Sequence, residues 1–144
     1  MSHRALSPSL SIDATVRVRY KETDQMGIAH HANYLAWFEI GRTDLCRAVG
    51  TTYREIEESG LLLVVTEIGC RYRVPFRYDD EVVIRTGVEL ASPRGMRFVY
   101  ELRSSEGTIC ASGFSAHIWL DAATRRPIAV RGPVIERFAK FIAR

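Results

Sequence analysis

Residues 19–34 read RYKETDQMGIAHHANY and join a strand pattern to a helix pattern. Before them, apolar and basic side chains alternate over residues 16–20, which is the period of a β-strand. After them, apolar side chains recur every three or four residues from Tyr34 to Val49, which is the period of an α-helix. The turn between the two patterns is polar and contains a glycine, one aspartate and two histidines.

The polar turn brings an acid, Asp24, to the start of the predicted helix. Asn33 is a suitable N-cap residue and Gly50 a suitable C′ residue, so the helix is predicted over residues 33–49. The first N–H groups of a helix lack intrahelical acceptors and carry about half a positive charge. They can polarise a carbonyl while a nearby carboxylate attacks it or activates water. Residues 20–34 therefore supply both parts needed for acyl transfer.

Length and charge favour a single domain that binds a small molecule. The 144 residues fit one domain, which we expect to span residues 12–144 after a flexible tail at residues 1–11. The net charge of +3 is mild, and the arginines are spread along the predicted strands. This distribution argues against a nucleic-acid surface and suits an anionic small molecule better.

The three cysteines are widely spaced and form no C-x-x-C motif, so neither a disulfide framework nor a zinc site is expected. The first eleven residues are polar and do not resemble a secretory signal. The longest apolar run, residues 61–65, is too short to span a membrane. We therefore expect a reduced, cytoplasmic setting.

Beyond residue 60 the sequence has the period of strands. Short turns separate four alternating segments, at residues 61–76, 81–90, 96–103 and 108–120. A capping-box spacing at Thr52 predicts a short helix before them, and Pro133 suits the first turn of a closing helix. One long helix beside about five antiparallel strands predicts an α+β fold, with a curved sheet wrapped around that helix.

Several motif residues match a known family. They are Arg19-Tyr20-x-Glu22-Thr23-Asp24-x-x-Gly27-Ile28-x-x-His31-x-Asn33-Tyr34, then Phe38-Glu39-x-x-Arg42, and more weakly Tyr72-x-x-Pro75-x-Arg77-Tyr78-Asp79-Asp80 and Arg126-Pro127. The pattern closely resembles the hotdog-fold acyl-CoA thioesterases of the 4-hydroxybenzoyl-CoA thioesterase and YbgC type. The resemblance implies a homodimer or homotetramer in which subunits share one continuous sheet, with active sites at the subunit interface.

The resemblance also implies residue roles. Asp24 matches the catalytic carboxylate, which acts as nucleophile or general base. The His31 N–H is expected to contact the thioester carbonyl, while the His31 side chain and the Tyr20 ring match catalytic or supporting positions. We expect the turn and the first helical residues to contact the substrate through Gly27, Ile28, Asn33 and Tyr34. We expect arginines to contact the phosphates of coenzyme A: Arg73, Arg77 and Arg94.

Other interpretations of the same residues are less favoured. A metal site at Asp24, His30 and His31 is not expected, because adjacent histidines point in different directions and no other ligand cluster accompanies them. His30 is expected to be structural or exposed. Glu39 and Arg42 have the i,i+3 spacing of a surface ion pair.

We predict hydrolysis of acyl-CoA, or of acyl carrier protein thioesters, to a free acid and a thiol. No cofactor is expected, since coenzyme A is part of the substrate. Two alternatives stay open. The same fold hosts hydratases and dehydratases that act on acyl thioesters, and a fold alone is also compatible with a non-catalytic acyl-CoA-binding protein. The sequence does not indicate the acyl group.

Overall fold

The structure is a computed structural model in which residues 5–142 are described. Its strands are β1 (Ile12–Arg17), β2 (Leu61–Tyr72), β3 (Glu81–Ala91), β4 (Gly95–Arg103) and β5 (Ile109–Asp121). Its helices are α1 (Asn33–Ala48), α2 (Tyr53–Glu58) and α3 (Pro133–Ala139), with short 3-10 turns η1 (Pro8–Leu10) and η2 (Tyr20–Glu22). The predicted α+β class is confirmed.

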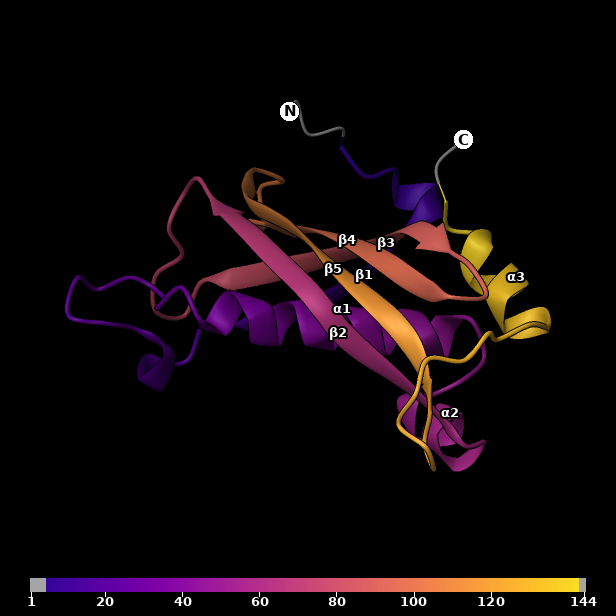
Figure 1. The fold of residues 1–144 in the computed structure, drawn as a ribbon. Helices are drawn as coiled ribbons and strands as arrows, with labels where there is room; N and C mark the ends of the chain where they lie inside the picture. Colours follow the sequence, from indigo (N-terminus) through magenta and orange to yellow (C-terminus); the bar gives the residue numbers. More distant parts are fainter. Residues whose placement is uncertain (1–4, 143–144) are drawn as a thin grey trace.

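The five strands form one antiparallel sheet in the order β1-β3-β4-β5-β2. Figure 1 shows the sheet lying across one side of α1, with the loop before α1 projecting beyond the sheet at the left. β3, β4 and β5 follow one another along the chain and are neighbours, whereas β2 comes earlier in the chain and pairs with β5 at the sheet's edge. The predicted sheet around one helix is therefore present.

The α1 helix packs closely on the sheet because it carries a glycine where it meets β3. A Cβ atom on Gly41 would clash with Thr86 Oγ1 and lie 2.7 Å from Ile84 Cγ2, so any side chain would force the helix away. One turn earlier, the Phe38 ring stacks on the Tyr100 ring of β4 at a centroid distance of 4.3 Å. Close packing at these positions fixes α1 against the middle of the sheet.

The ends of α1 differ in part from the prediction. Asn33 is not the N-cap: it is the first helical residue, and Ala32 occupies the cap position without a side-chain hydrogen bond. The C-terminal end is as predicted, because Gly50 follows the C-cap with a φ of 89°. The α2 cap is also as predicted, since Thr52 Oγ1 accepts a hydrogen bond from Glu55 N at 3.1 Å.

The prediction that Glu39 and Arg42 form an ion pair on the surface is wrong. Arg42 points into the protein and is buried, and its guanidinium donates to the hydroxyls of Tyr53 and Tyr100, each at 3.0 Å. The sheet around α1 covers this helix position, so Arg42 finds partners on α2 and β4. The network continues from Tyr100 through Ser115 to the buried His117, whose Nε2 lies 2.8 Å from Ser115 Oγ.

The N-terminal segment before β1 contacts the sheet from residue 6 onward. Leu6 N donates to the Glu101 carboxylate at 2.8 Å, and Ser11 is buried. Residues 1–4 of the predicted tail lie outside the described residues. Cys46 and Cys110 are buried, Cys70 is partly buried, and all three are free thiols. None of the helices within residues 5–142 is long and apolar enough to cross a membrane.

Candidate active site

The loop between β1 and α1 is a closed, hydrogen-bonded unit. His30 N donates to Glu22 O at 2.7 Å, Thr23 pairs with Ala29, and Asp24 N donates to Ile28 O at 2.9 Å. These contacts pair the two arms of the loop like a short hairpin. Asp24 therefore lies near the tip of the loop, and the arm that returns from the tip leads directly into α1.

Asp24 is partly buried at the tip. Its Oδ1 accepts a hydrogen bond from Met26 N at 2.8 Å, and its backbone carbonyl accepts from Gly27 N at 3.0 Å. Gly27 has a φ of 78°, a backbone conformation that glycine adopts without strain. Within residues 5–142 the second carboxylate oxygen, Oδ2, accepts no hydrogen bond. The turn thus holds the carboxylate by one oxygen and leaves the other available.

Glu22 supports the outgoing arm of the loop from the inside. Its carboxylate is buried and accepts a hydrogen bond from Arg19 N at 2.7 Å, with the Arg19 Nε at 3.3 Å. Burial alone would raise the pKa of Glu22, but the hydrogen bonds and charge of Arg19 outweigh it and hold that pKa below its usual value. The backbone carbonyl of Glu22 also accepts from the Asn33 side chain at 2.8 Å. Asn33 thus ties the loop to the helix instead of capping it.

The first turn of α1 is preceded by the two histidines. His30 Nδ1 accepts from Ala32 N at 3.1 Å, and His30 O accepts from Asn33 N at the same distance. His30 therefore has a structural part in the turn before the helix. The His31 N–H, in contrast, donates no hydrogen bond to any described residue. It is a free amide donor at the positive end of α1.

The strand β2 reaches this turn through Tyr72. Its hydroxyl donates to His31 O at 2.9 Å, and its ring meets the His31 ring edge-on at 6.3 Å. The Tyr72 ring also contacts the Tyr34 ring at 4.7 Å, and Tyr34 is buried against Trp37 and Phe76. Tyr34 thus forms part of the aromatic core beneath the turn. Tyr72 has no role predicted from the sequence, although it stands in the matched Tyr72-x-x-Pro75 motif.

The predicted substrate-contacting residues separate into two groups. Ile28 pairs with Arg77, and Ala29 N donates to Phe76 O, so the segment after β2 lies beside the Asp24 loop. Arg73 is exposed in the same segment. Arg94, however, lies in the hairpin between β3 and β4, at the end of the sheet opposite the Asp24 loop. Within one chain, Arg94 and Asp24 are therefore far apart.

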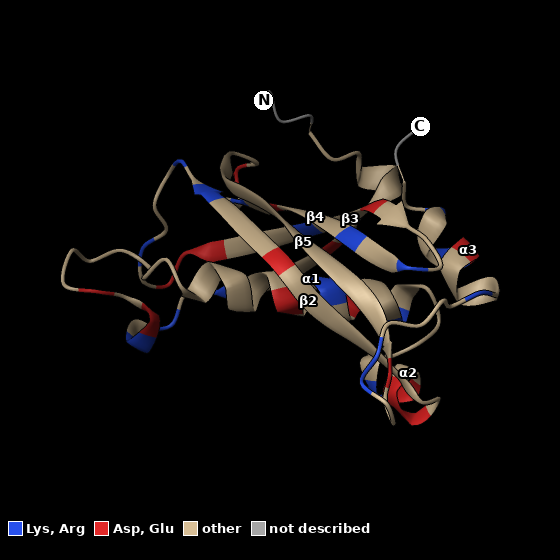
Figure 2. Cartoon of the chain, viewed as in Figure 1, with Lys and Arg blue, Asp and Glu red and all other residues tan. Residues whose placement is uncertain are grey.

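Tyr20 is 79% exposed and contacts Tyr78 edge-on at a centroid distance of 5.8 Å. Both tyrosines are exposed, so within one chain Tyr20 faces solvent. Figure 2 shows basic and acidic positions interspersed along the strands and loops. Among residues 5–142, no three His, Cys, Asp or Glu side chains are grouped so that they could hold a metal ion.

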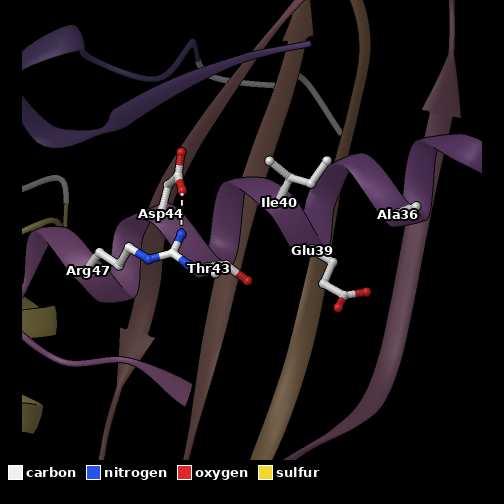
Figure 3. A pocket seen from close by; sticks show the side chains of 6 residues that line it. All are labelled: Ala36, Glu39, Ile40, Thr43, Asp44 and Arg47. Carbon is white, nitrogen blue, oxygen red and sulfur yellow. Dashed lines mark hydrogen bonds and ion pairs between the residues drawn. The ribbon is translucent and has the colours of Figure 1, made fainter. Parts of the chain in front are cut away.

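A hollow of about 370 Å³ lies on the face of α1 that points away from the sheet. Figure 3 shows its lining, which includes Ala36, Ile40 and the ion pair between Asp44 and Arg47 at 3.0 Å. It is separate from the Asp24 carboxylate.

The family model of the thioesterase-like superfamily matches residues 18–138, which include the Asp24 loop, all of α1 and the strands β2 to β5. The chain belongs to this superfamily. Its motif residues Asp24 and His31 fall within the matched region. The sheet wrapped around one helix is the hotdog fold of solved thioesterases, and the predicted fold and family are both confirmed.

Members of the thioesterase-like superfamily and related structures are similar along most of the chain. YneP of Bacillus subtilis (strain 168) is 37% identical over 116 residues, which cover 81% of this chain and 84% of the relative. Acyl-CoA thioesterase YbgC of Haemophilus influenzae is 31% identical over 116 residues, which cover 79% of this chain and 84% of the relative. The structure of DHNA-CoA thioesterase from Staphylococcus aureus matches with a TM-score of 0.79 and 30% identity, covering 83% of this chain and 80% of that one.

Proposed function

We propose that this protein hydrolyses acyl-CoA thioesters, or thioesters of acyl carrier protein, to a free acid and a thiol. One observation carries the proposal: the loop at residues 22–31 joins a carboxylate with a free oxygen to an unpaired amide at a helix N-terminus. A relative that is 31% identical bears the name acyl-CoA thioesterase.

In this mechanism the His31 N–H binds the thioester oxygen and stabilises the negative charge that develops there. Asp24 either takes a proton from the attacking water or attacks the carbonyl carbon itself to form a mixed anhydride that water then cleaves. In both routes the C–S bond breaks, and the thiolate leaves and is protonated. An oxyanion donor typically contributes about 2.7 to 4 kcal/mol to transition-state stabilisation, and general-base catalysis about 10²- to 10⁴-fold in rate. No cofactor enters this scheme.

The proposal includes a homodimer or homotetramer with active sites at the subunit interface, in a cytoplasmic setting that would keep the three thiols reduced. β2 is an edge strand, and Val64 and Val65 on it are 38% and 43% exposed. Unpaired strand edges with exposed apolar side chains favour pairing with another chain. The exposed face of α1 offers a second surface. In such an assembly Arg94 would reach the Asp24 loop of a partner subunit, where it would bind coenzyme A phosphates with Arg73 and Arg77.

The test is thiol release from a panel of short, long and aromatic acyl-CoAs. We expect release by the wild-type protein and a turnover slowed by about 10²- to 10⁴-fold in Asp24→Asn, since an amide is neither a base nor a nucleophile. Asp13→Asn is the matched control, because Asp13 lies on β1 and pairs with Arg85. The control should turn over at the wild-type rate even if its Tm falls with the loss of the ion pair to Arg85, and Asp24→Asn should keep the wild-type Tm.

Other outcomes would point elsewhere. Nearly full activity of Asp24→Asn would refute the assigned role of Asp24. If no thiol is released but a double bond in the acyl chain is hydrated or formed, the protein is a hydratase or dehydratase. If acyl-CoA binds and is recovered unchanged, the protein is a binding protein.

A further inference from the structure

We propose that Tyr72 is a positioning residue for thioester hydrolysis, acting through its hydrogen bond to the carbonyl of His31. The inference rests on the proposed function and deepens it. Tyr72 is the last residue of β2, and it is 41 positions from His31 in the sequence. The bond therefore links the edge of the sheet to the turn that carries the free amide donor.

The turn is held from two sides. On the loop side, Glu22 O accepts from His30 N at 2.7 Å and from Asn33 Nδ2 at 2.8 Å. On the sheet side, Tyr72 is the only strand residue in the described part of the chain whose side chain hydrogen-bonds the turn at residues 30–32. Without it, the sheet would contact this turn through ring packing alone, which does not set the rotation of a peptide plane.

The position of His31 matters for the reaction, because the carbonyl that Tyr72 binds and the free N–H belong to the same residue, on either side of its Cα. An oxyanion donor is effective only when it is fixed in advance toward the position of the developing charge. His31 O accepts both from Tyr72 and from Tyr34 N, which lies 3.2 Å away, so the two donors fix the His31–Ala32 peptide. The free N–H lies in the preceding peptide, which is joined to this one through the His31 Cα. Loss of one donor should leave the residue more mobile, which slows turnover more than it weakens substrate binding.

The hydroxyl is suited to permanent donation. Tyr72 is 48% exposed, and the desolvation of its covered part, with Cys70 alongside, raises its pKa to about 12, so the hydroxyl stays protonated at any pH at which the enzyme would be assayed. Its ring is fixed edge-on against Tyr34 at 4.7 Å and against His31 at 6.3 Å. Tyr72 therefore acts on the reaction indirectly: it contacts the turn and does not contact the reacting atoms.

The experiment compares Tyr72→Phe with Tyr78→Phe. The first removes only the hydroxyl and keeps the ring contacts. The second removes the hydroxyl of a tyrosine that is 57% exposed at the same end of the protein and whose hydroxyl has no hydrogen-bond partner among the described residues. We measure kcat, KM and Tm, together with the amide ¹H and ¹⁵N shifts of His31 and Ala32.

For Tyr72→Phe we expect kcat to fall by about tenfold, which corresponds to one lost hydrogen bond, with KM within about twofold and Tm within about 2 °C of wild type. The His31 and Ala32 amide shifts should move. Tyr78→Phe should change none of these values. If the wild-type protein releases no thiol, the proposed function fails, but the amide shifts still test whether Tyr72 positions the turn.

Three results would overturn the inference while leaving the proposed function standing. The first is wild-type kcat in Tyr72→Phe. The second is a rise in KM at constant kcat, which would make Tyr72 a substrate-binding residue. The third is a fall in kcat with unmoved His31 and Ala32 amide shifts, which would mean that the hydroxyl does not act through the turn.

Discussion

At the scale of single residues, the buried polar network beside α1 shows how the protein accommodates a cation in its core. Arg42 donates to two tyrosine hydroxyls, and within residues 5–142 no carboxylate is paired with it. His117, at the far end of the network, is 3% exposed, and its Nδ1 has no hydrogen-bond partner among the described residues. A second positive charge here would be both desolvated and repelled by Arg42.

This network predicts a dependence of stability on pH. Burial, reinforced by the Arg42 charge, lowers the pKa of His117 from 6.5 to about 4. Between these values the unfolded chain binds a proton that the folded chain does not, so the stability of the folded state decreases as the pH falls from 6.5 toward 4. The loss amounts to roughly 3 kcal/mol at most, because each pKa unit corresponds to about 1.4 kcal/mol.

The measurement is urea unfolding of wild type and His117→Gln at several pH values between neutral pH and about 4. Glutamine has no charge to gain, so the wild type should lose stability relative to the variant as the pH falls. Parallel curves for the two proteins over this range would show that His117 does not titrate on unfolding as expected.

At the scale of elements, the contact between α1 and β3 determines where the catalytic loop lies, because the loop runs from β1 directly into α1. β1 pairs with β3, and α1 packs on β3 at Gly41. Displacement of the helix at this contact would therefore also displace the turn that carries His31. Stability and site geometry depend on the same contact.

Gly41→Ala is predicted to destabilise the protein by about 1 to 3 kcal/mol, the usual range for overpacking a core. In an unhindered helix the same change would stabilise by about 0.5 to 1 kcal/mol. Here the added methyl group would meet Thr86 and Ile84. Urea unfolding measures the effect. Ala36→Gly, on the exposed face, is the control and should cost only about 0.5 to 1 kcal/mol. A stabilised Gly41→Ala variant would contradict the close packing.

At the scale of the whole molecule, the sheet ends in two edges of different character. β1 is short, with six residues, and its exposed side chains are polar or charged. β2 has twelve residues and exposes two valines near its bulge between Val65 and Glu67. A long edge strand with exposed valines is the more favourable one for pairing with a second copy of the chain.

Val65→Lys is therefore predicted to weaken subunit association, because a lysine on an edge strand opposes strand pairing. Light scattering after size exclusion should show a smaller species, and kcat/KM for acyl-CoA should fall with it if the sites lie at the interface. Thr15→Lys on β1 is the matched control and should leave mass and activity unchanged. An unchanged mass for Val65→Lys would place the interface elsewhere or make the protein a monomer.

The sequence by itself determined the parts of this protein that depend on neighbouring residues. Strand alternation and helical spacing predicted the elements to within a few residues, and Gly50 and Thr52 marked helix ends correctly. The Asp24 loop was predictable because residues 19–34 contain it entirely. Its family motif is contiguous, so no long-range contact had to be inferred.

Only the tertiary structure decided which distant residues meet. It placed Arg42 in the core, made Asn33 a link to Glu22 instead of a cap, and brought Tyr72 to the carbonyl of His31. It also placed Arg94 at the opposite end of the sheet from Asp24. Periodicity reports which side of an element is buried but not what covers it, because the covering strand comes from a remote part of the chain and is chosen by the packing of the whole sheet around α1.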